Sequence, residues 1–466
     1  MRGRSAYYQS SGGYGFRDQL QDSLACLPAD PKITRSQLLL HAAHQFADGT
    51  VHHWWHPLTE RGHHTEMTDD LLWLAYITLF YLKETKDFSI LDEKAIYLDA
   101  PEGDLYDHCC RAIDKVFTRF SPRGLPLIGE GDWNDGMNMV GLHWKGESIW
   151  LGHFLYGILM DFSHICGLRN DTNRKSEYLN KAELLKKSIN EYAWDGDWYL
   201  GATKDNGELM GSKQCKEGKI FLNAQSWAVF NDVATPERAK KCMESVERIL
   251  DLKYGPLLAT PAYTVPDETI GYVTRYAAGI RENGGVYTHG ACWAIKAECY
   301  MKNNKRAYSM YSRISPVRRG LDPDMYRVEP YVTPGNTDGP ESPFFGRGGW
   351  TWYTGSGAWL YNVSTDWILG IRATYEGLLI DPCIPREWPG YKARRVFRKA
   401  AYNIEVVNSR DGSGDIRCVE LDGKKQKSNL IPDLSDNKTH EVKIIMGAKN
   451  DLAEKRTKKA ELAKCN

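Results

Sequence analysis

The chain has 466 residues, which is more than one hydrophobic core usually holds, so we expect a large domain with a deep cleft and a smaller second domain. Its 60 Lys and Arg balance 60 Asp and Glu, which excludes the strong net field of proteins that bind nucleic acid or anionic membranes. This balance favours a small neutral or singly charged ligand. The 15 Trp and 26 Tyr are typical of a sugar site, because the C–H faces of sugars stack on aromatic rings, and the alternative is that these residues fill a large core.

The compartment is predicted from the cysteines and from the apolar runs. The 11 cysteines are odd in number and include no CxxC pair, which argues against a disulfide framework or a zinc site. The first residues lack the apolar core of a signal peptide, and no apolar run reaches the about 18 residues of a membrane span. We therefore expect a cytoplasmic protein with reduced thiols and no membrane partner.

Helical periodicity dominates from Phe16 to about Ile371, and convincing strand patterns are almost absent there. About eleven helices are predicted, near residues 16–27, 34–48, 67–84, 104–121, 146–167, 175–193, 223–232, 235–250, 287–303, 305–315 and 355–370. Long connectors rich in glycine and aromatic residues join them. Because loops on a rigid scaffold usually carry function, we expect a mainly α fold, an (α/α)6 barrel with its site at the loop-bearing end.

The pattern changes after Ile371 to short alternating runs separated by Gly, Asp, Asn and Pro, such as RRVFRKAAYNIEVVNSR, IRCVELDG and HEVKIIMG. This change predicts a catalytic domain over residues 1–371 and a small C-terminal β domain over residues 372–449. The charged stretch 450–466 is expected to be a frayed helix or a disordered tail.

A histidine cluster, HHWWHP at 52–57 followed by RGHHTEMTDD at 61–70, places five histidines within thirteen positions. The spacing matches no HExxH helix, and no Cys or Glu stands at a usual zinc interval, so a metal site is disfavoured. We expect loop-borne histidines, tryptophans and Arg61 to bind polar ligand groups. Asp69 and Asp70 open a predicted helix, and at least one of them is expected to cap it.

The segment GEGDWNDGMN, residues 129–138, is the strongest local signal. Glycine on both sides lets the backbone approach a ligand closely, and a carboxyl group beside the indole of Trp133 would be partly desolvated. Desolvation raises the pKa of a carboxyl group and keeps it protonated, so Asp135 is a candidate general acid, with Asp132 as its neighbour in the motif. A calcium-like or Asx-turn loop is the alternative, and the motif alone leaves both open.

Two glycine-rich segments, GIRENGGVYTHGACW at 279–293 and GRGGWTWYTGSGAWL at 346–360, each end where a helix is predicted to begin. Free backbone N–H groups at such a helix start can hold an anion of phosphate size. Thr354 and Gly355 are the candidates, with His289 and Arg17 supplying charge-assisted hydrogen bonds. The alternative is that this helix entry binds nothing. No GxxxxGK[ST] pattern is present, which disfavours a nucleoside triphosphate.

The motifs YYQSSGGYGFRDQLQDSL, HHWWHP, TDDLLWLAY, GDWNDGMN, NAQSW, GIRENGGVYTH, EPYV and WTWYTGSGAW occur in an order that resembles glycoside hydrolase family 94. The family includes cellobiose, chitobiose and cellobionic acid phosphorylases and the phosphorylase-like end of cyclic β-1,2-glucan synthases. The resemblance also covers the β segment. It implies inverting phosphorolysis of a β-glucoside to α-glucose 1-phosphate, with phosphate as a co-substrate and no cofactor.

The resemblance also implies roles for single residues. Asp135 matches the general acid of the family, and Trp133 and Asp18 match residues that contact the donor sugar. The phosphate site of the family matches four residues of this chain, namely Arg17, His289, Thr354 and Gly355. One catalytic carboxyl group is enough for this reaction, because phosphate is itself the nucleophile and no base must deprotonate a water.

Two departures from the family are visible. Some members carry an additional Arg shortly before GFRD, where this chain has SSGGYG, and members usually begin with a β-sandwich and a helical linker that this sequence does not include. A fragment or split gene product is therefore expected, and a homodimer is expected only where that N-terminal domain is supplied. A non-catalytic carbohydrate-binding fragment is one alternative function.

An inverting hydrolase is the other alternative, and it would need a second carboxylate to activate water, for which Glu282 and Glu329 are candidates. The acceptor sugar is predicted with cellobionic acid first and a β-1,2-glucan second. A carboxylate acceptor needs a cation, and Arg275 and Arg281 are the candidates on the connector before His289. The alternative for each arginine is an ion pair with a nearby Glu at the surface.

Overall fold

The computed structural model describes residues 1, 12–409 and 414–447 of the chain. The predicted tail, 450–466, and the first residues of the YYQSSGG motif lie outside this part. Each of the eleven predicted helices is present, as α1 (Phe16–Ser23), α2 (Pro31–Ala42), α3 (Leu72–Thr85), α4 (Leu105–Phe117), α5 (Ile149–Leu168), α6 (Thr172–Tyr192), α7 (Leu222–Phe230), α8 (Pro236–Ser245), α9 (Thr288–Tyr300), α10 (Asn304–Ile314) and α13 (Thr354–Asn362). Two short helices, α11 (Pro316–Arg319) and α12 (Pro323–Tyr326), were not predicted.

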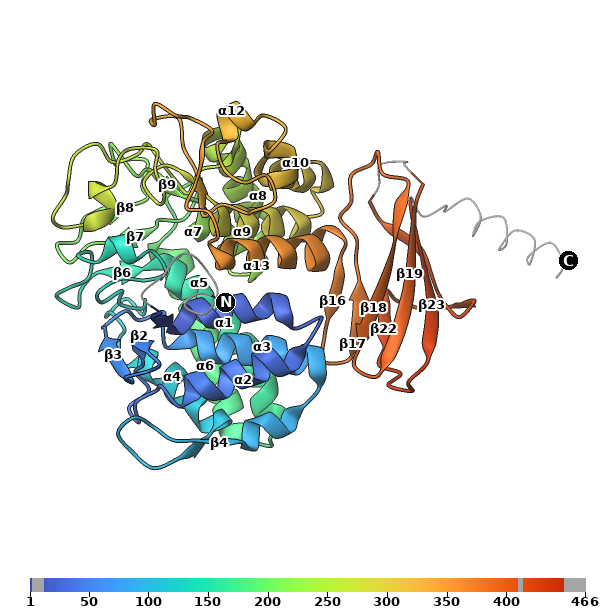
Figure 1. Ribbon diagram of the computed structural model, residues 1–466. Helices are drawn as coiled ribbons and strands as arrows, with labels where there is room; N and C mark the ends of the chain where they lie inside the picture. Colours follow the sequence, from blue (N-terminus) through green and yellow to red (C-terminus); the bar gives the residue numbers. More distant parts are fainter. Residues whose placement is uncertain (2–11, 410–413, 448–466) are drawn as a thin grey trace, which may run out of the picture.

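Six of the helices contact one another in a closed cycle. In the order of the cycle, α1 contacts α3, α3 contacts α5, α5 contacts α7, α7 contacts α9, α9 contacts α13, and α13 returns to α1. Most residues of these helices are buried; α3, for example, is apolar on most sides and buries eleven of its residues. A helix that is apolar all round is expected where other helices surround it. The cycle therefore forms the interior of the helical part, visible in Figure 1.

Tryptophans fill the centre of this cycle. Trp73, Trp150, Trp227 and Trp293 come from α3, α5, α7 and α9, and all four are fully buried. The ring of Trp227 lies edge-on to Trp150 at 5.7 Å and to Trp293 at 5.2 Å between centroids. Trp359 of α13 contacts Trp293 at 5.6 Å. Such edge-to-face pairs stabilise a core beyond the area they bury, so the high Trp content has a structural role as well.

The remaining long helices pack outside the cycle, each against the helix that precedes it in the chain: α2 on α1, α4 on α3, α6 on α5, α8 on α7 and α10 on α9. The helix α6 illustrates their amphipathic character. It buries Tyr178, Ala182, Leu185 and Ile189, at intervals of three or four residues, and leaves its other face to solvent. Within the described residues, no helix is long and apolar enough to cross a membrane.

Short strands join the loops at one end of the helices, and these were not predicted. The longest are β2 (His52–His56) and β3 (Arg61–His64), which pair antiparallel and continue to β1 (Tyr14–Gly15). The histidine cluster expected on a loop therefore lies on a hairpin. Most other strands of the helical part have two residues, too few for an alternating pattern to be visible in the sequence.

After Ile371 the chain forms strands, as its alternating pattern predicts. A three-stranded sheet contains β16 (Ile371–Ala373), β17 (Gly377–Ile380) and β22 (Leu430–Pro432). A five-stranded sheet has the order β18 (Gly390–Phe397), β19 (Ala400–Asn408), β23 (Thr439–Met446), β20 (Ile416–Leu421) and β21 (Lys424–Lys425). Every second residue of β19 and β23 is buried, and Figure 1 shows these strands beside the helices.

Candidate functional site

A cavity of about 220 Å³ lies at the N-terminal ends of three helices of the cycle. Helix α1 contributes Arg17 and Asp18, α9 contributes His289, and Tyr353 directly precedes α13. The other lining residues are Gln21, His53, Trp133, Asp135, Arg281, Glu282, Tyr287 and Trp350. A larger hollow of about 880 Å³ around Lys204 and Asp267 is lined by none of the predicted site residues, so the smaller cavity is the candidate site.

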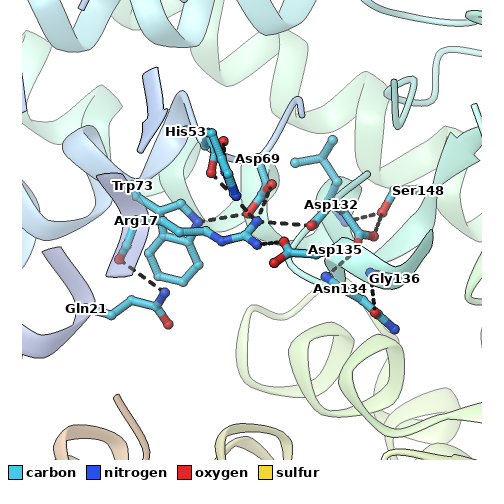
Figure 2. A network of polar contacts seen from close by, with 12 residues as sticks. Arg17, Gln21, His53, Asp69, Trp73, Asp132, Asn134, Asp135, Gly136 and Ser148 are labelled. Carbon is cyan, nitrogen blue, oxygen red and sulfur yellow. Dashed lines mark hydrogen bonds and ion pairs between the residues drawn. The ribbon is translucent and has the colours of Figure 1, made fainter. Parts of the chain in front are cut away.

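Arg17 is the centre of a buried polar network (Figure 2). Its Nη1 donates to both carboxylate oxygens of Asp69 at 2.9 Å and to the backbone carbonyl of Asp132 at 3.0 Å. Its Nη2 donates to Oδ1 of Asp135. The guanidinium therefore joins the start of α1 to the GDWNDGMN loop and to the segment before α3.

Burial alone would lower the pKa of Arg17, but Asp135, Asp69 and Asp70 outweigh it and hold this pKa well above the usual value. In a simple ion pair with Arg17 the pKa of the Asp69 carboxyl group would be lowered, but here it is raised. Its burial, with Asp70 and Asp132 adding to it, outweighs the attraction of Arg17 and raises the pKa of its carboxyl group. The site thus contains more carboxylates than its cations can neutralise, which favours uptake of a proton.

His53 is a second cation of the site. Its Nδ1 lies 2.8 Å from Oδ2 of Asp70. Burial would lower the pKa of this imidazole, but the charge and the hydrogen bond of Asp70 raise it to about 9. His53 is therefore an imidazolium at neutral pH and lines the cavity next to Arg17.

Asp69 and Asp70 do not cap the helix that follows them, which corrects the prediction. The N-cap of α3 is Leu71, which makes no side-chain capping bond. Asp69 instead accepts from Arg17 and from Nε1 of Trp73 at 3.0 Å, while Asp70 holds His53. Both carboxylates are buried. A buried carboxylate is stabilised more by a cationic side chain than by backbone N–H groups, so the two residues pair with Arg17 and His53.

The GDWNDGMN loop is shaped by its own side chains. Asp132 accepts from the backbone N–H of Asn134 at 2.9 Å and from Oγ of Ser148 at 2.6 Å, and Asn134 accepts from the N–H of Gly136 at 3.1 Å. These are Asx-type turns, as the alternative interpretation of this motif predicted, and Asp132 and Asn134 therefore shape the loop. Gly136 has no room for a side chain, because a Cβ would lie 2.5 Å from that of Val273.

Asp135 is the carboxyl group of this loop that faces the cavity. Its side chain is 38% exposed, so it is only partly withdrawn from solvent. Asp132 is the desolvated group instead, and burial raises the pKa of its carboxyl. No described residue forms a hydrogen bond with Oδ2 of Asp135, and this oxygen is available to a ligand.

The four predicted phosphate residues come together at the ends of α1, α9 and α13. Arg17 and His289 line the cavity, whereas Thr354 and Gly355 form the first turn of α13 directly after the lining residue Tyr353. Oγ1 of Thr354 donates to Asp22 of α1 at 2.5 Å. Among the described residues, no group of three or more His, Cys, Asp or Glu could hold a metal ion.

The predicted acceptor residues separate into two groups. Arg281 and Glu282 line the cavity, and their Nε and Oε2 atoms lie 3.2 Å apart. The guanidinium of Arg281 lies over Trp350, 3.8 Å from its ring centroid. Arg275 lies outside the cavity, where it forms a surface ion pair with Glu268, which corrects its predicted orientation.

Glu329 also lies outside the cavity and accepts from Nε1 of Trp352 at 3.1 Å. His53 belongs to the histidine cluster that was expected to bind a ligand, whereas several other lining residues were not selected from the sequence, namely Gln21, Tyr287, Trp350 and Tyr353. Each of them stands within or beside a motif that was quoted, for example Tyr287 in GVYTH. Proximity to a predicted residue was the available signal, but aromatic residues there were equally expected in the core.

The sequence of the chain matches a known protein family. Residues 1–370 match the family described as the glycosyl hydrolase 94 superfamily, catalytic domain. The chain is 39% identical over 448 residues to the cyclic β-(1,2)-glucan synthase NdvB of Rhizobium meliloti (strain 1021), covering 91% of this chain and 16% of that protein. It is 34% identical to the solabiose phosphorylase of Paenibacillus borealis, with 93% of this chain and 56% of that protein covered.

The cellobionic acid phosphorylase of Neurospora crassa is 31% identical, with 92% of this chain and 55% of that protein covered. The chain spans about half the length of these phosphorylases and less of the synthase. Among solved structures, the GH78 family rhamnosidase of Bacillus sp. GL1 has a TM-score of 0.58 at 11% identity, with 94% of this chain and 40% of that chain covered. This last likeness concerns the fold alone.

Proposed function

The chain belongs to the glycosyl hydrolase 94 superfamily, and from this premise we propose that it catalyses inverting phosphorolysis of a β-glucoside. A phosphate oxygen attacks C1 of the glucosyl unit from the α face, and the bond from C1 to the acceptor oxygen breaks. The acceptor oxygen takes a proton from Asp135, and α-glucose 1-phosphate is released. The observation that carries this proposal is the meeting of Asp135 with Arg17 and His289 in one cavity.

Asp135 is proposed as the general acid because its Oδ2 faces the cavity while Oδ1 is held by Arg17. Arg17 stabilises the carboxylate that remains after the proton has left. Asp135 is proposed to regain its proton from solvent or from phosphate before the next turnover. Asp18 and Trp133, which also line the cavity, are proposed to contact the donor sugar.

Phosphate is proposed to bind between His289, Arg17 and the first turn of α13, where Thr354 and Gly355 offer backbone N–H groups at the positive end of the helix. The guanidinium of Arg17 already holds two carboxylates, so it contributes charge more than free donors. His53 adds a further positive charge to the same cavity.

The acceptor is proposed to meet Arg281 and Glu282. Both side chains line the cavity, where Nε of Arg281 and Oε2 of Glu282 form an ion pair at 3.2 Å. Because the two side chains neutralise one another, we propose a neutral β-glucoside first and an aldonate or uronate glucoside as the alternative. The relatives include both kinds, a β-1,2-glucan synthase and a cellobionic acid phosphorylase.

We also propose that the six-helix cycle is the inner ring of an (α/α)6 barrel, with α2, α4, α6, α8 and α10 in its outer ring. The catalytic domain would then comprise residues 1–371 and the β domain residues 372–449. The match of the family to residues 1–370 supports this boundary. A dimer and a cytoplasmic location remain proposals of the same kind.

Reverse phosphorolysis tests the function. The purified chain is supplied with α-glucose 1-phosphate and, in turn, glucose, sophorose, gluconate and glucuronate, and released phosphate is measured. We expect phosphate release with a neutral acceptor and none without an acceptor. Release of free glucose from a β-glucoside in buffer without phosphate would instead favour the hydrolase, with Glu282 of the same cavity as its base. Sugar binding without any turnover would favour the non-catalytic fragment.

A further inference from the structure

The candidate cavity is too small for a whole substrate. Its volume of about 220 Å³ lies below the roughly 300–1,000 Å³ of pockets that enclose drug-sized ligands. The cavity can hold the reacting glucosyl unit and part of the acceptor. Any further sugar units of a chain would have to lie outside this cavity.

An exposed pair of aromatic side chains lies on the connector that supplies Trp350. Trp352 is 46% exposed and Tyr331 is 74% exposed, and their ring centroids are 6.2 Å apart at an angle of 71°. Glu329 accepts a hydrogen bond from the indole Nε1 of Trp352 at 3.1 Å. The bond restricts the orientation of this partly exposed ring and places a carboxylate beside it.

The backbone between the cavity and this pair is strained. Trp350 has φ +57° and Trp352 has φ +61°, values that are rare for bulky side chains. The ring of Trp350 lines the cavity and stacks on Tyr353 at 4.5 Å, whereas Trp352 lies outside it. The same turn therefore directs one indole inward and the next outward. Such strain usually persists where the orientation of side chains serves a function.

We propose that Trp352, Tyr331 and Glu329 form an outer acceptor subsite for the second and later units of a neutral β-linked gluco-oligosaccharide. The C–H faces of a glucosyl ring would stack on the indole and the phenol, and Glu329 would accept a hydrogen bond from a sugar hydroxyl. This inference rests on the proposed function, because it extends the acceptor side of the same site. Glu329 thereby acts in binding and not as the base of a hydrolase.

The test compares acceptors of increasing length. Reverse phosphorolysis is measured with α-glucose 1-phosphate and with glucose, sophorose or β-1,2-linked tri- and tetrasaccharides, for the parent chain and for the variants Trp352→Ala, Trp352→Phe and Tyr331→Ala. In the parent we expect kcat/KM to rise about tenfold from glucose to the trisaccharide. Trp352→Ala should lose this rise and leave kcat/KM for glucose unchanged, while Trp352→Phe keeps most of it.

The control is Tyr192→Ala, which removes an exposed tyrosine at the end of α6, outside the cavity and the proposed subsite. It should behave like the parent with every acceptor. A parent with equal kcat/KM for all lengths overturns the outer subsite and leaves the proposed function intact. An equal loss for glucose and trisaccharide in Trp352→Ala overturns it as well, because Trp352 would then act through the cavity or the fold.

A binding measurement separates the two proposals where turnover is absent. Isothermal titration calorimetry with the tetrasaccharide measures its binding affinity without any reaction taking place. Binding that is weakened about tenfold in Trp352→Ala but not in Tyr192→Ala supports the subsite even if the phosphorylase proposal fails. Binding equal in both variants overturns the subsite.

Discussion

Arg17 is central to the charges of the candidate site, because among the described residues it alone forms hydrogen bonds with both Asp69 and Asp135. Four carboxylates, those of Asp69, Asp70, Asp132 and Asp135, surround it, and His53 is the second cation. Burial raises the pKa of the Asp69 and Asp132 carboxyl groups in this cluster. This arrangement suits a reaction that consumes a proton from Asp135.

We predict that Asp135→Asn reduces kcat by about 10²–10⁴-fold, because the amide keeps the shape but has no acidic proton to donate. Asp132→Asn should act on stability, since Asp132 is buried and closes the turn with Asn134 and Ser148. Rates of reverse phosphorolysis and thermal unfolding midpoints of both variants check this. A larger loss of kcat in Asp132→Asn would move the acid to Asp132.

His289→Ala is expected to raise the KM for phosphate by about ten- to a hundredfold and to change the KM for the sugar much less. The loss corresponds to one charge-assisted contact of about 1.5–3 kcal/mol. Arg17→Ala should have the same kinetic effect and also lower the free energy of unfolding, because it leaves Asp69 buried and unpaired. Initial rates over a matrix of phosphate and sugar concentrations separate the two constants. Equal changes in both would place phosphate elsewhere.

His53 should make the stability of the fold depend on pH. Its folded-state pKa of about 9 lies above the ordinary 6.5, so the contribution of the His53–Asp70 pair is fully present below pH 6.5 and is lost as the pH rises through about 9. The difference amounts to at most about 3 kcal/mol. Urea unfolding at pH 6 and at pH 9.5 should therefore show a smaller decline for His53→Asn than for the parent. The same decline in both would mean that another group titrates.

At the scale of helices and strands, periodicity predicted most of the framework. Each of the eleven predicted helices lies near its expected position, because the core-facing residues of α6 and its neighbours repeat at helical spacing. The hairpin of β2 and β3 was not predicted, because HHWWH has no apolar alternation and its partner RGHH is exposed along its whole length. The predicted cap at Asp69 and Asp70 was wrong because Arg17, 52 residues away, decides their role.

The candidate site was predictable to the extent that its residues stand in compact motifs. Arg17, Asp135 and His289 were selected and line one cavity. The sequence could not show that Arg275 turns to Glu268 while Arg281 turns inward, because the two orientations depend on a loop with no regular structure after the short turn Tyr272–Arg275. The orientation of a side chain in a loop depends on tertiary contacts, and these contacts produce no periodic pattern in the sequence.

The contact of α1 with α13 closes the helical cycle, and we predict that Trp359→Phe weakens it. Nε1 of Trp359 donates to Oε1 of Gln21 at 2.9 Å, and both side chains are buried. The variant leaves this oxygen without its donor, which should lower the free energy of unfolding by about 1–3 kcal/mol. Tyr361→Phe on the exposed side of α13 is the control and should change it by less than about 0.5 kcal/mol. Indistinguishable urea midpoints would show that the bond contributes nothing.

At the scale of the whole molecule, the helical part and the strands after Ile371 are joined by buried polar contacts. Nη2 of Arg395 on β18 lies 2.6 Å from each carboxylate oxygen of Glu84 on α3. Arg398 donates to the backbone carbonyl of Lys83 at 3.0 Å, and Tyr375 donates to Asp161 of α5 at 2.9 Å. The strands therefore hold the C-terminal ends of inner helices, opposite the ends that build the site.

We predict that Arg395→Met lowers the free energy of unfolding by about 3–5 kcal/mol, because it leaves Glu84 buried without its cation. The double variant Glu84→Gln with Arg395→Met should recover most of the loss, since no unpaired charge remains. Lys392→Met on the same strand is the control, because its ion pair with Glu405 is exposed and should contribute less than about 1 kcal/mol.

Tryptophan fluorescence reports mainly the helical part, which contains every Trp except Trp388, and circular dichroism reports the whole chain. If the two parts unfold as one unit, both signals should shift together in Arg395→Met. A shift no larger than that of Lys392→Met would show that the strands do not stabilise the helices through this pair.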